Sequence, residues 1–131
     1  MLRLFFIKSM KILDAINLEK SLLLILNDDN HEELSLELLY IIKINKKNIS
    51  ELTDIFFEKQ NFLIKKFFKT ESDFNNKELM EKYQDEYDKL LNDDINVQIN
   101  LLPLNDKNVD NIKNIIKDNQ LILDGMKPII K

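Results

Sequence analysis

A long amphipathic stretch between Asn48 and Phe68 constrains the fold of this chain more than any other sequence feature. Asn48 stands three residues before Glu51, the spacing at which an amide and a carboxylate cap the first turn of a helix reciprocally. The apolar residues that follow are Ile49, Leu52, Ile55, Phe56, Leu63 and Phe67. Their steps of three, four and seven place them along one face of a helix. The stretch therefore predicts a helix whose apolar face must pack against other parts of the chain.

Residues that break helices are rare in this chain. Among its 131 residues, Gly125 is the only glycine, and Pro103 and Pro128 are the only prolines. Tight β-turns need residues that tolerate positive φ, and glycine is the usual one. Asparagine also tolerates such angles and is abundant here, so the composition favours helices without excluding strands. Gly125, followed by Pro128, suits the C-terminal cap of a last helix.

These patterns predict an all-α fold, an antiparallel bundle of four or five amphipathic helices in a single domain of residues 1–131. The expected helices cover residues 1–26, 31–44, 48–68, 76–102 and 109–126, with short polar loops between them. Two of them begin at further candidate capping boxes, Asn30 with Glu33 and Asn75 with Glu78.

Two segments fit more than one interpretation. The polar residues 45–48 favour a loop, although the apolar residues on either side keep a heptad spacing that would also fit one helix through 31–68. Residues 95–101 alternate between apolar and polar side chains, as a strand does, yet they also continue the apolar stripe of the helix before them. We predict a break at 45–48 and helix at 95–101.

The charge and hydropathy of the chain argue against two kinds of partner. A net charge of −4 at pH 7 offers no general attraction to the phosphate backbone of nucleic acids. The longest uninterrupted apolar run, Leu22–Leu26, is far too short for a membrane span. Near the N-terminus, Lys8 ends the apolar run before the run reaches the length of the apolar region of a signal peptide. We therefore expect a cytoplasmic protein without a membrane span.

The residue types that carry most enzyme chemistry are scarce. Cysteine is absent, and one glycine cannot form a phosphate-binding loop. Asp28-x-x-His31 resembles half of a di-iron site, but His31 is the only histidine and such a site needs two. The pairs Asp28 with Asp29 and Asp93 with Asp94 lack the spacing of a calcium loop. We predict no enzymatic activity, no cofactor and no metal ion; a site of Lys, Glu and Tyr side chains stays open.

Phenylalanines are concentrated in the long amphipathic stretch. Most of them are expected in the core, because aromatic side chains dominate core packing more often than they line ligand pockets. Phe57 and Phe68, however, directly follow Phe56 and Phe67, and neighbours on a helix point about 100° apart. We therefore expect Phe57 or Phe68 to face a second helix or to remain exposed, as in a protein-binding module.

The same stretch resembles a known family, the small helical flagellar type III export chaperones of the FliT and FlgN kind. Their pattern is a short acidic or amide cap, an L-x-x-L/I-hydrophobic segment, then E-R-Q with an apolar pair close behind. The corresponding residues here are Asn48, Leu52, Ile55-Phe56, Glu58-Lys59-Gln60 and Phe62-Leu63. The chain departs from the pattern at Lys59, where the family favours Arg, and at Ile64, where an acidic residue is usual.

The resemblance implies a cytosolic escort that binds aggregation-prone helical segments of export substrates and carries out no catalysis. In this family the substrate-contacting surface lies largely on the C-terminal helices. The residues of this chain in that position are Ile112, Ile116, Leu123 and Met126. An amphipathic partner helix would be bound in a groove through anchors at i, i+3, i+4 and i+7. We expect a monomer or weak homodimer; the alternative is a structural coiled-coil adaptor that forms an obligate oligomer.

The segment 109–131 also differs from the rest of the sequence. Its helical part is polar around most of its circumference and carries only a narrow apolar seam. A helix with so narrow a seam buries little surface, so we expect it to be the least firmly docked and most mobile element. We predict that it opens to present the same four residues to a partner. The alternative is that it completes the core.

Overall fold

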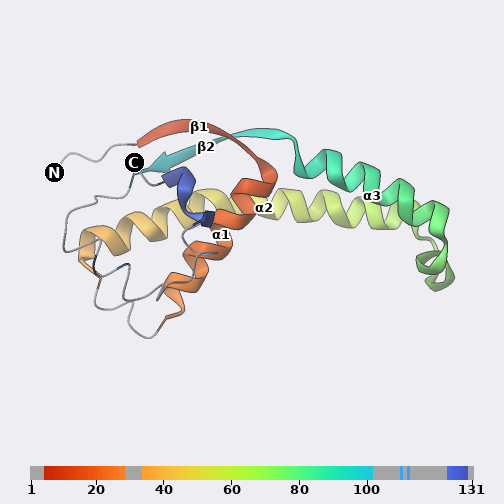
Figure 1. Ribbon diagram of the computed structural model, residues 1–131, viewed down its shortest axis with the longest axis horizontal. Helices are drawn as coiled ribbons and strands as arrows, with labels where there is room; N and C mark the ends of the chain where they lie inside the picture. The colour runs from red at the N-terminus through yellow and green to blue at the C-terminus, as the bar shows by residue number, and fades with distance from the viewer. Residues whose placement is uncertain (1–4, 29–33, 102–109, 111, 113–123, 130–131) are drawn as a thin grey trace.

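The computed structural model describes residues 5–28, 34–101, 110, 112 and 124–129 (Figure 1). In this part of the chain, three α-helices and two short 3-10 helices accompany a two-stranded antiparallel sheet. The elements in chain order are β1 (Phe5–Lys11), α1 (Ile12–Leu26), α2 (Leu36–Phe67), η2 (Glu71–Asn75), α3 (Lys77–Leu91), β2 (Asp94–Asn100) and η3 (Lys127–Ile129). The prediction of an all-α bundle of four or five helices is therefore wrong.

The error lies at the two segments that form the sheet. Strand β1 pairs with β2 in a register that runs from Phe5 opposite Asn100 to Lys11 opposite Asp94. The alternation in residues 95–101 thus belongs to a strand, and the helix expected over 1–26 begins only at Ile12. Far-apart segments form this pair, so no short hairpin turn marked it in the sequence.

The sheet has one buried and one exposed face, as its alternating side chains require. Met10, Val97 and Ile99 are buried and belong to the same core cluster as residues of α1 and α2. On the opposite face, Ile7 and Gln98 lie opposite each other and are both exposed. The sheet therefore closes one side of a core that the helices complete.

Helix α2 is continuous through the segment that was expected to form a loop. It begins after Ser35, whose Oγ accepts a hydrogen bond from the amide of Leu38 at 3.1 Å, and it runs for 32 residues, about 48 Å. The predicted break at 45–48 and the predicted cap at Asn48 are therefore wrong, whereas the predicted cap at Asn30 lies outside the described residues.

The side-chain amides of Asn45 and Asn48 in this segment of α2 instead form hydrogen bonds with the outer edge of β2. Asn45 is fully buried; its Nδ2 donates to the carbonyl of Asn100 at 2.8 Å, and its Oδ1 accepts from the amide of Asn100 at 2.8 Å. One turn later, Asn48 Nδ2 donates to the carbonyl of Gln98 at 3.3 Å. Because strand-edge groups need partners when buried, these polar residues mark a helix–strand contact rather than a loop.

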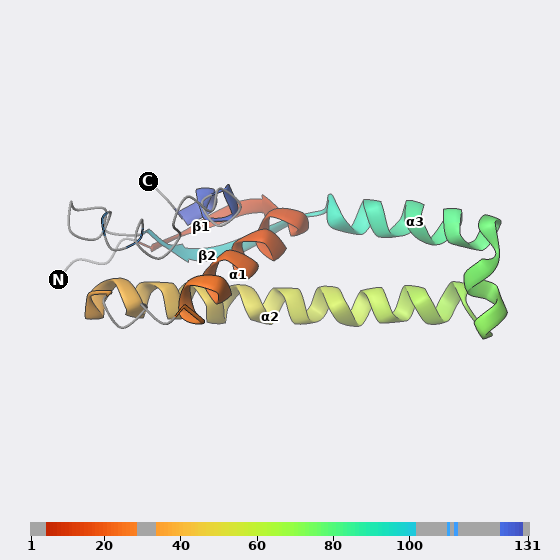
Figure 2. The same ribbon diagram turned by 60° about the horizontal axis from the view of Figure 1, so that its bottom comes forward.

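The molecule divides into a body and an arm (Figure 1). We call the body β1, β2, α1 and α2 up to Thr53, together with the described C-terminal residues. The arm is α2 beyond Thr53, with η2 and α3. Figure 2 shows the arm projecting from the body, with α3 alone lying beside α2. The buried core of the body comprises Met10, Ala15, Leu18, Leu22, Ile25, Leu34, Leu38, Ile41, Ile42, Ile49, Val97, Ile99, Ile112 and Met126.

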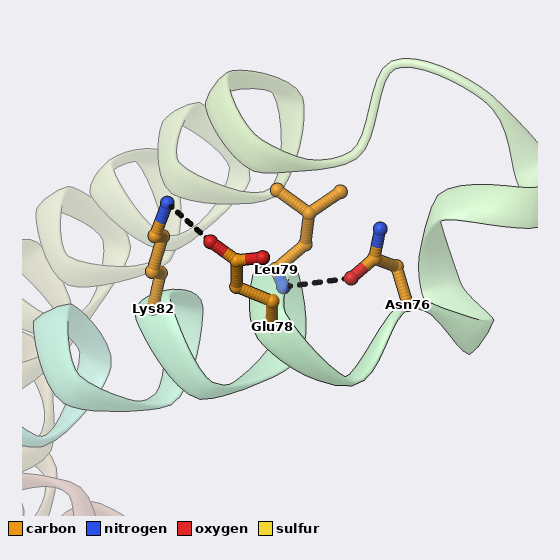
Figure 3. A network of polar contacts seen from close by, with 4 residues as sticks. All are labelled: Asn76, Glu78, Leu79 and Lys82. Atoms are coloured by element: carbon orange, nitrogen blue, oxygen red, sulfur yellow. Dashed lines mark hydrogen bonds and ion pairs between the residues drawn. The ribbon is translucent and has the colours of Figure 1, made fainter.

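Local signals account for the arm hairpin. Helix α3 begins after Asn76, whose Oδ1 accepts from the amide of Leu79 at 3.2 Å, one residue later than the predicted cap at Asn75 (Figure 3). Glu78 instead pairs with Lys82 at 3.2 Å, one turn along the same helix. An N-cap amide fixes where a helix can start, so it sets the position at which the chain turns back along α2.

The single glycine is placed where the C-terminal residues approach α1 closely. A Cβ atom on Gly125 would lie 2.6 Å from the carbonyl oxygen of Asn17 and would overlap the hydroxyl of Ser21. The close approach of this segment to α1 therefore accounts for a glycine at position 125. It does so without the helix C-cap role that the spacing from Pro128 suggested. Lys8 Nζ donates to the carbonyl of Pro128 at 3.1 Å and ties the same segment to β1.

Candidate protein-binding surface

Two adjoining hollows lie along one flank of the arm and at its junction with the body, between α2, α3, the start of α1 and the start of β2. Their volumes are about 260 Å³ and 350 Å³, and they share Lys59, Leu90 and Asp93. We call them together the arm groove. Its lining residues are Ile12, Ala15, Leu52, Thr53, Ile55, Phe56, Lys59, Phe62, Leu63, Glu86, Lys89, Leu90, Asp93, Asp94 and Ile95.

The groove has an apolar floor and large apolar side chains on its rim. Phe56 and Leu90 are buried in the floor, and Leu63 packs against them. On the rim, Ile55 is 52% exposed and Phe62 is 69% exposed. These two residues are seven apart on α2, so they stand on the same face, two turns from each other. Apolar side chains of this size that remain exposed beside a groove are a feature of protein-binding surfaces.

Aromatic contacts between α2 and α3 support the walls of the groove. The ring centroid of Tyr87 lies 5.9 Å from that of Phe56 and 5.7 Å from that of Tyr83. Tyr83 in turn lies 5.4 Å from Phe68, near the tip of the arm. Tilted and offset ring pairs of this kind stabilise beyond the area that they bury. The series of rings holds α3 against α2 along the length of the arm.

Polar contacts stabilise the arm at both ends of this flank. At the body, Glu19 Oε2 accepts hydrogen bonds from Ser50 Oγ at 2.7 Å and from Thr53 Oγ1 at 2.8 Å, which join α1 to α2. Further out, Lys66 Nζ and Glu86 Oε1 lie 3.7 Å apart and link α2 to α3. The Glu19 contacts involve the buried Thr53, whereas the Lys66 pair is exposed and contributes little.

Of the four predicted partner-binding residues, the structure describes two, and both lie away from the arm groove. Ile112 and Met126 are buried in the core of the body. Ile116 and Leu123 lie outside the described residues. A partner would reach Ile112 and Met126 only if their segment left the core, so contact through these four residues stays a prediction.

The prediction that Phe57 or Phe68 faces a second helix or remains exposed is confirmed: Phe57 is exposed and Phe68 contacts Tyr83 of α3. Phe57 is 46% exposed and makes an edge contact with Phe56, with the ring centroids 5.3 Å apart. Phe68 is buried and stacks on Phe74 at 4.6 Å. Phe62, the most exposed aromatic of the groove rim, belongs to the apolar pair of the family resemblance, but its exposure was not predicted because the predicted apolar face of α2 does not include it. The sequence feature that could have drawn attention to Phe62 is the apolar residue Leu63 next to it.

One carboxylate at the tip of the arm has a pKa below its ordinary value. The backbone amides of Thr70 and Lys69 donate to Asp73 at the arm tip and lower its pKa below the ordinary value of 3.8. Asp93 and Asp94 line the arm groove. Among the described residues, no three His, Cys, Asp or Glu side chains are grouped so as to hold a metal ion, and His31 lies outside them.

In the described ranges, no helix has both the length and the apolar character that crossing a membrane requires. Comparison of the chain with models of known protein families, with curated proteins and with solved structures found no match.

Proposed function

We propose that this chain is a non-catalytic protein-binding protein whose arm groove holds an amphipathic helix of a protein partner. One observation carries the proposal: Ile55 and Phe62 remain exposed above a groove whose floor is apolar. An amphipathic helix that lies in such a groove buries its anchors at i, i+3, i+4 and i+7. Burial of the two rim side chains supplies the apolar part of the binding free energy.

The dimensions of the groove set the length of the partner segment. Ile55 and Phe62 are seven residues apart on α2, which corresponds to about 10 Å along its axis. A partner helix of two to three turns would cover both. Lys59 lies between them, and Asp93 and Glu86 line the other wall. Charges at the rim contribute to orientation and selectivity more than to affinity.

The narrower form of the proposal is an export chaperone in the cytoplasm. Here the partner is a helical segment of a secreted flagellar or related substrate, as the resemblance of the Asn48–Leu63 stretch implies. Under the same proposal, a second contact through Ile112, Ile116, Leu123 and Met126 forms when the C-terminal segment opens. The exposed aromatic side chains of the arm support a chaperone because aggregation-prone segments are bound through apolar surface.

A structural adaptor that acts as an obligate oligomer is the second candidate. The exposed apolar and charged face of α2 favours it, because such a face can pair with another helix. Light scattering of the purified protein separates the two candidates. A concentration-independent oligomer would support the adaptor, whereas a monomer or a weak dimer that binds a helical partner would support the chaperone.

Affinity capture from the native host tests the groove directly. The bait with Ile55→Asp and Phe62→Asp places two charges on the rim and is expected to lose the partners that the unchanged chain retains. The matched control carries Leu24→Asp and Leu36→Asp, which are exposed positions on the body, 51% and 85% respectively. This control is expected to keep the partners. Capture of the same partners by all three baits, with unchanged circular dichroism, would contradict the proposal.

A further inference from the structure

The two edges of the sheet have different surroundings. The outer edge of β2 is bonded by α2, where Asn45 and Asn48 make hydrogen bonds with the backbone of Asn100 and Gln98. Strand β1 forms the opposite edge, and β2 lies between β1 and α2 (Figure 1). The sheet can therefore gain a further strand only at β1.

The hydrogen-bonding pattern shows which backbone groups of β1 point outward. Opposite residues in an antiparallel pair direct their amides and carbonyls either toward each other or away from each other. The carbonyl of Gln98 accepts a hydrogen bond from α2, so it points away from β1. Ile7 stands opposite Gln98, and Ser9 opposite Asn96, two residues further along. The amides and carbonyls of Ile7 and Ser9 therefore point to the outer edge, and within the described ranges they have no hydrogen-bonding partner.

A hollow of about 630 Å³ lies beside β1. Its walls are residues 8–10 of β1, one face of α1 between residues 14 and 24, and the C-terminal residues from 124 to 128. We call this hollow the β1 trench. On the other face of the strand, the side chain of Ile7 is 63% exposed and that of Ser9 is exposed as well. The outward backbone groups of β1 thus have open space on both faces of the strand.

We propose that an extended acidic segment of a protein partner adds to β1 as a third strand of the sheet. Its backbone pairs with the amides and carbonyls of Ile7 and Ser9. These groups repeat at every second residue, a spacing that an extended chain matches and a helix does not. Alternate side chains of the segment lie beside Ile7 or enter the β1 trench. The site is separate from the arm groove and does not depend on it.

The charges at this edge favour a segment that carries carboxylates. Lys8 and Lys11 are the only charged residues of β1, and lysines outnumber aspartates by three to two in the trench. Lys127 and Asp124 pair with each other there at 3.5 Å. Asp94 of β2 stands opposite Lys11. In a chain whose net charge is −4, this edge is locally positive and attracts acidic side chains.

The same lysines argue against a second copy of this chain on β1. Two β1 strands side by side would bring only lysines to the shared edge as charged residues, so every ionic contact between the strands would be repulsive. Lysine on an exposed edge is a common means by which proteins avoid pairing of identical edges. A partner strand with carboxylates instead turns Lys8 and Lys11 into attractive contacts.

Two synthetic peptides of the same length as β1, seven residues, test the proposal on the full chain. Valine alternates with glutamate in one peptide and with lysine in its counterpart; both are fluorescently labelled and blocked at their ends. Fluorescence anisotropy at low ionic strength should show at least roughly tenfold tighter binding of the glutamate peptide. Added salt should weaken that binding. The variant with Ile55→Asp and Phe62→Asp should bind the glutamate peptide as the unchanged chain does, because both positions lie on the arm.

Amide hydrogen exchange separates strand addition from other modes of binding. In the free protein, the amides of Ile7 and Ser9 should exchange fast, and those of Lys8 and Met10 slowly, because the latter two face β2. Saturating glutamate peptide should slow exchange at Ile7 and Ser9 at least about tenfold. Ser9→Pro removes an outward amide at an edge position and should abolish peptide binding, whereas Ser9→Ala should retain it.

Three results would overturn the proposal: no binding of the glutamate peptide, equal binding of the lysine peptide, or binding that leaves exchange at Ile7 and Ser9 unchanged. Slower exchange of these two amides as the concentration of the chain alone increases would assign the edge to a second copy, which also overturns the proposal. Circular dichroism checks the fold of Ser9→Pro. If this variant does not fold, the exchange measurement on the unchanged chain decides.

Discussion

The body and the arm are stabilised in different ways. The core of the body is almost entirely aliphatic and joins elements that are far apart in the sequence. The arm is a hairpin of neighbouring helices, and Leu90 is the one buried residue of α3. What joins α3 to α2 beyond it is mainly a series of aromatic rings, in which Phe56 of α2 and Phe68 at its C-terminal end are buried and Tyr83 and Tyr87 of α3 are partly exposed. The arm is therefore built from helices that are neighbours in the sequence, whereas the core of the body joins segments that are far apart in the sequence.

This difference explains where a binding surface can exist. In the body, α1, α2 and the sheet enclose the apolar side chains of a shared core, and the exposed apolar residues Ile7, Leu13, Leu24, Leu36 and Tyr40 lie outside that core. In the arm, α2 has only α3 beside it, so part of its apolar circumference stays exposed (Figure 2). An element with few buried contacts can also open without unfolding the rest of the protein. The predictions below test whether the two regions are as independent as their packing indicates.

The largest effect is expected from a cavity in the body. Leu22 is fully buried in α1, whereas Leu24, on the same helix, is 51% exposed. Leu22→Ala should lower the free energy of unfolding by about 2–5 kcal/mol, because the removed methyl groups leave a cavity. Leu24→Ala should lower it by less than about 1 kcal/mol. Urea unfolding of both variants measures the difference; equal losses would show that the α1 face is assigned wrongly.

The contact between α2 and the strand edge gives the next effect. Asn45→Ala leaves the amide and the carbonyl of Asn100 buried without their side-chain partner, and should cost about 2–4 kcal/mol of unfolding free energy. Asn48→Ala removes an exposed hydrogen bond and should cost no more than about 1 kcal/mol. Both substitutions gain the same helix propensity, so their difference reflects the burial of Asn45 and its second hydrogen bond. A larger loss for Asn48→Ala than for Asn45→Ala would contradict the assignment.

Much of the helical structure could be predicted from sequence, and the sheet could not. Periodicity located the C-terminal part of the long helix, whose true cap Ser35 was not predicted, and a capping signal placed the start of α3 within one residue. The alternation at 95–101 was visible, but its partner strand lies at the other end of the chain, and strand pairing between distant segments leaves no local mark. Asn45 was wrongly interpreted as part of a loop for a related reason. Its hydrogen-bonding partner, Asn100, is equally distant.

The candidate site was predictable only in part. Periodicity placed Ile55 and Phe56 on one broad apolar face, and the structure separates them into rim and floor. The spacing of residues fixes the angles at which side chains leave a helix, but not how much of the circumference a neighbour covers. Because α3 covers only one side, Phe56 is buried while Ile55 is exposed. The exposure of Phe62 follows from the same partial cover.

A smaller effect, confined to the arm, is expected from Phe68. Its buried ring contacts Phe74 and Tyr83, so Phe68→Ala should destabilise the arm by about 1–3 kcal/mol. Amide hydrogen exchange should accelerate at residues 60–67 and 79–87, while the amides of α1 keep their protection. Phe74→Ala, at a half-exposed position, serves as the control and should destabilise the arm less. Acceleration of exchange throughout α1 would show that the arm and the body unfold as one unit.

The smallest effect is expected at the arm tip, from Asp73. Its carboxylate accepts hydrogen bonds from the backbone amides of Lys69 at 2.7 Å and Thr70 at 3.0 Å. These donors favour the charged form of the carboxylate. The pKa of Asp73 is therefore lowered in the folded arm from its ordinary value of 3.8. A lowered pKa means that the stabilisation is fully present above the unfolded value and is lost as the pH falls through the folded one.

Titration of the Lys69 and Thr70 amide resonances between neutral and acid pH measures this local change. Their chemical shifts should move together at a midpoint below pH 3.8, and the movement should be absent in Asp73→Asn. Other carboxylates also become protonated in acid, so the comparison with Asp73→Asn is the control: amides that move equally in both proteins report other groups, and the difference isolates Asp73. A midpoint above 3.8 would mean that the carboxylate does not hold the turn, and the tip would then depend on its other contacts, among them the stacking of Phe68 on Phe74.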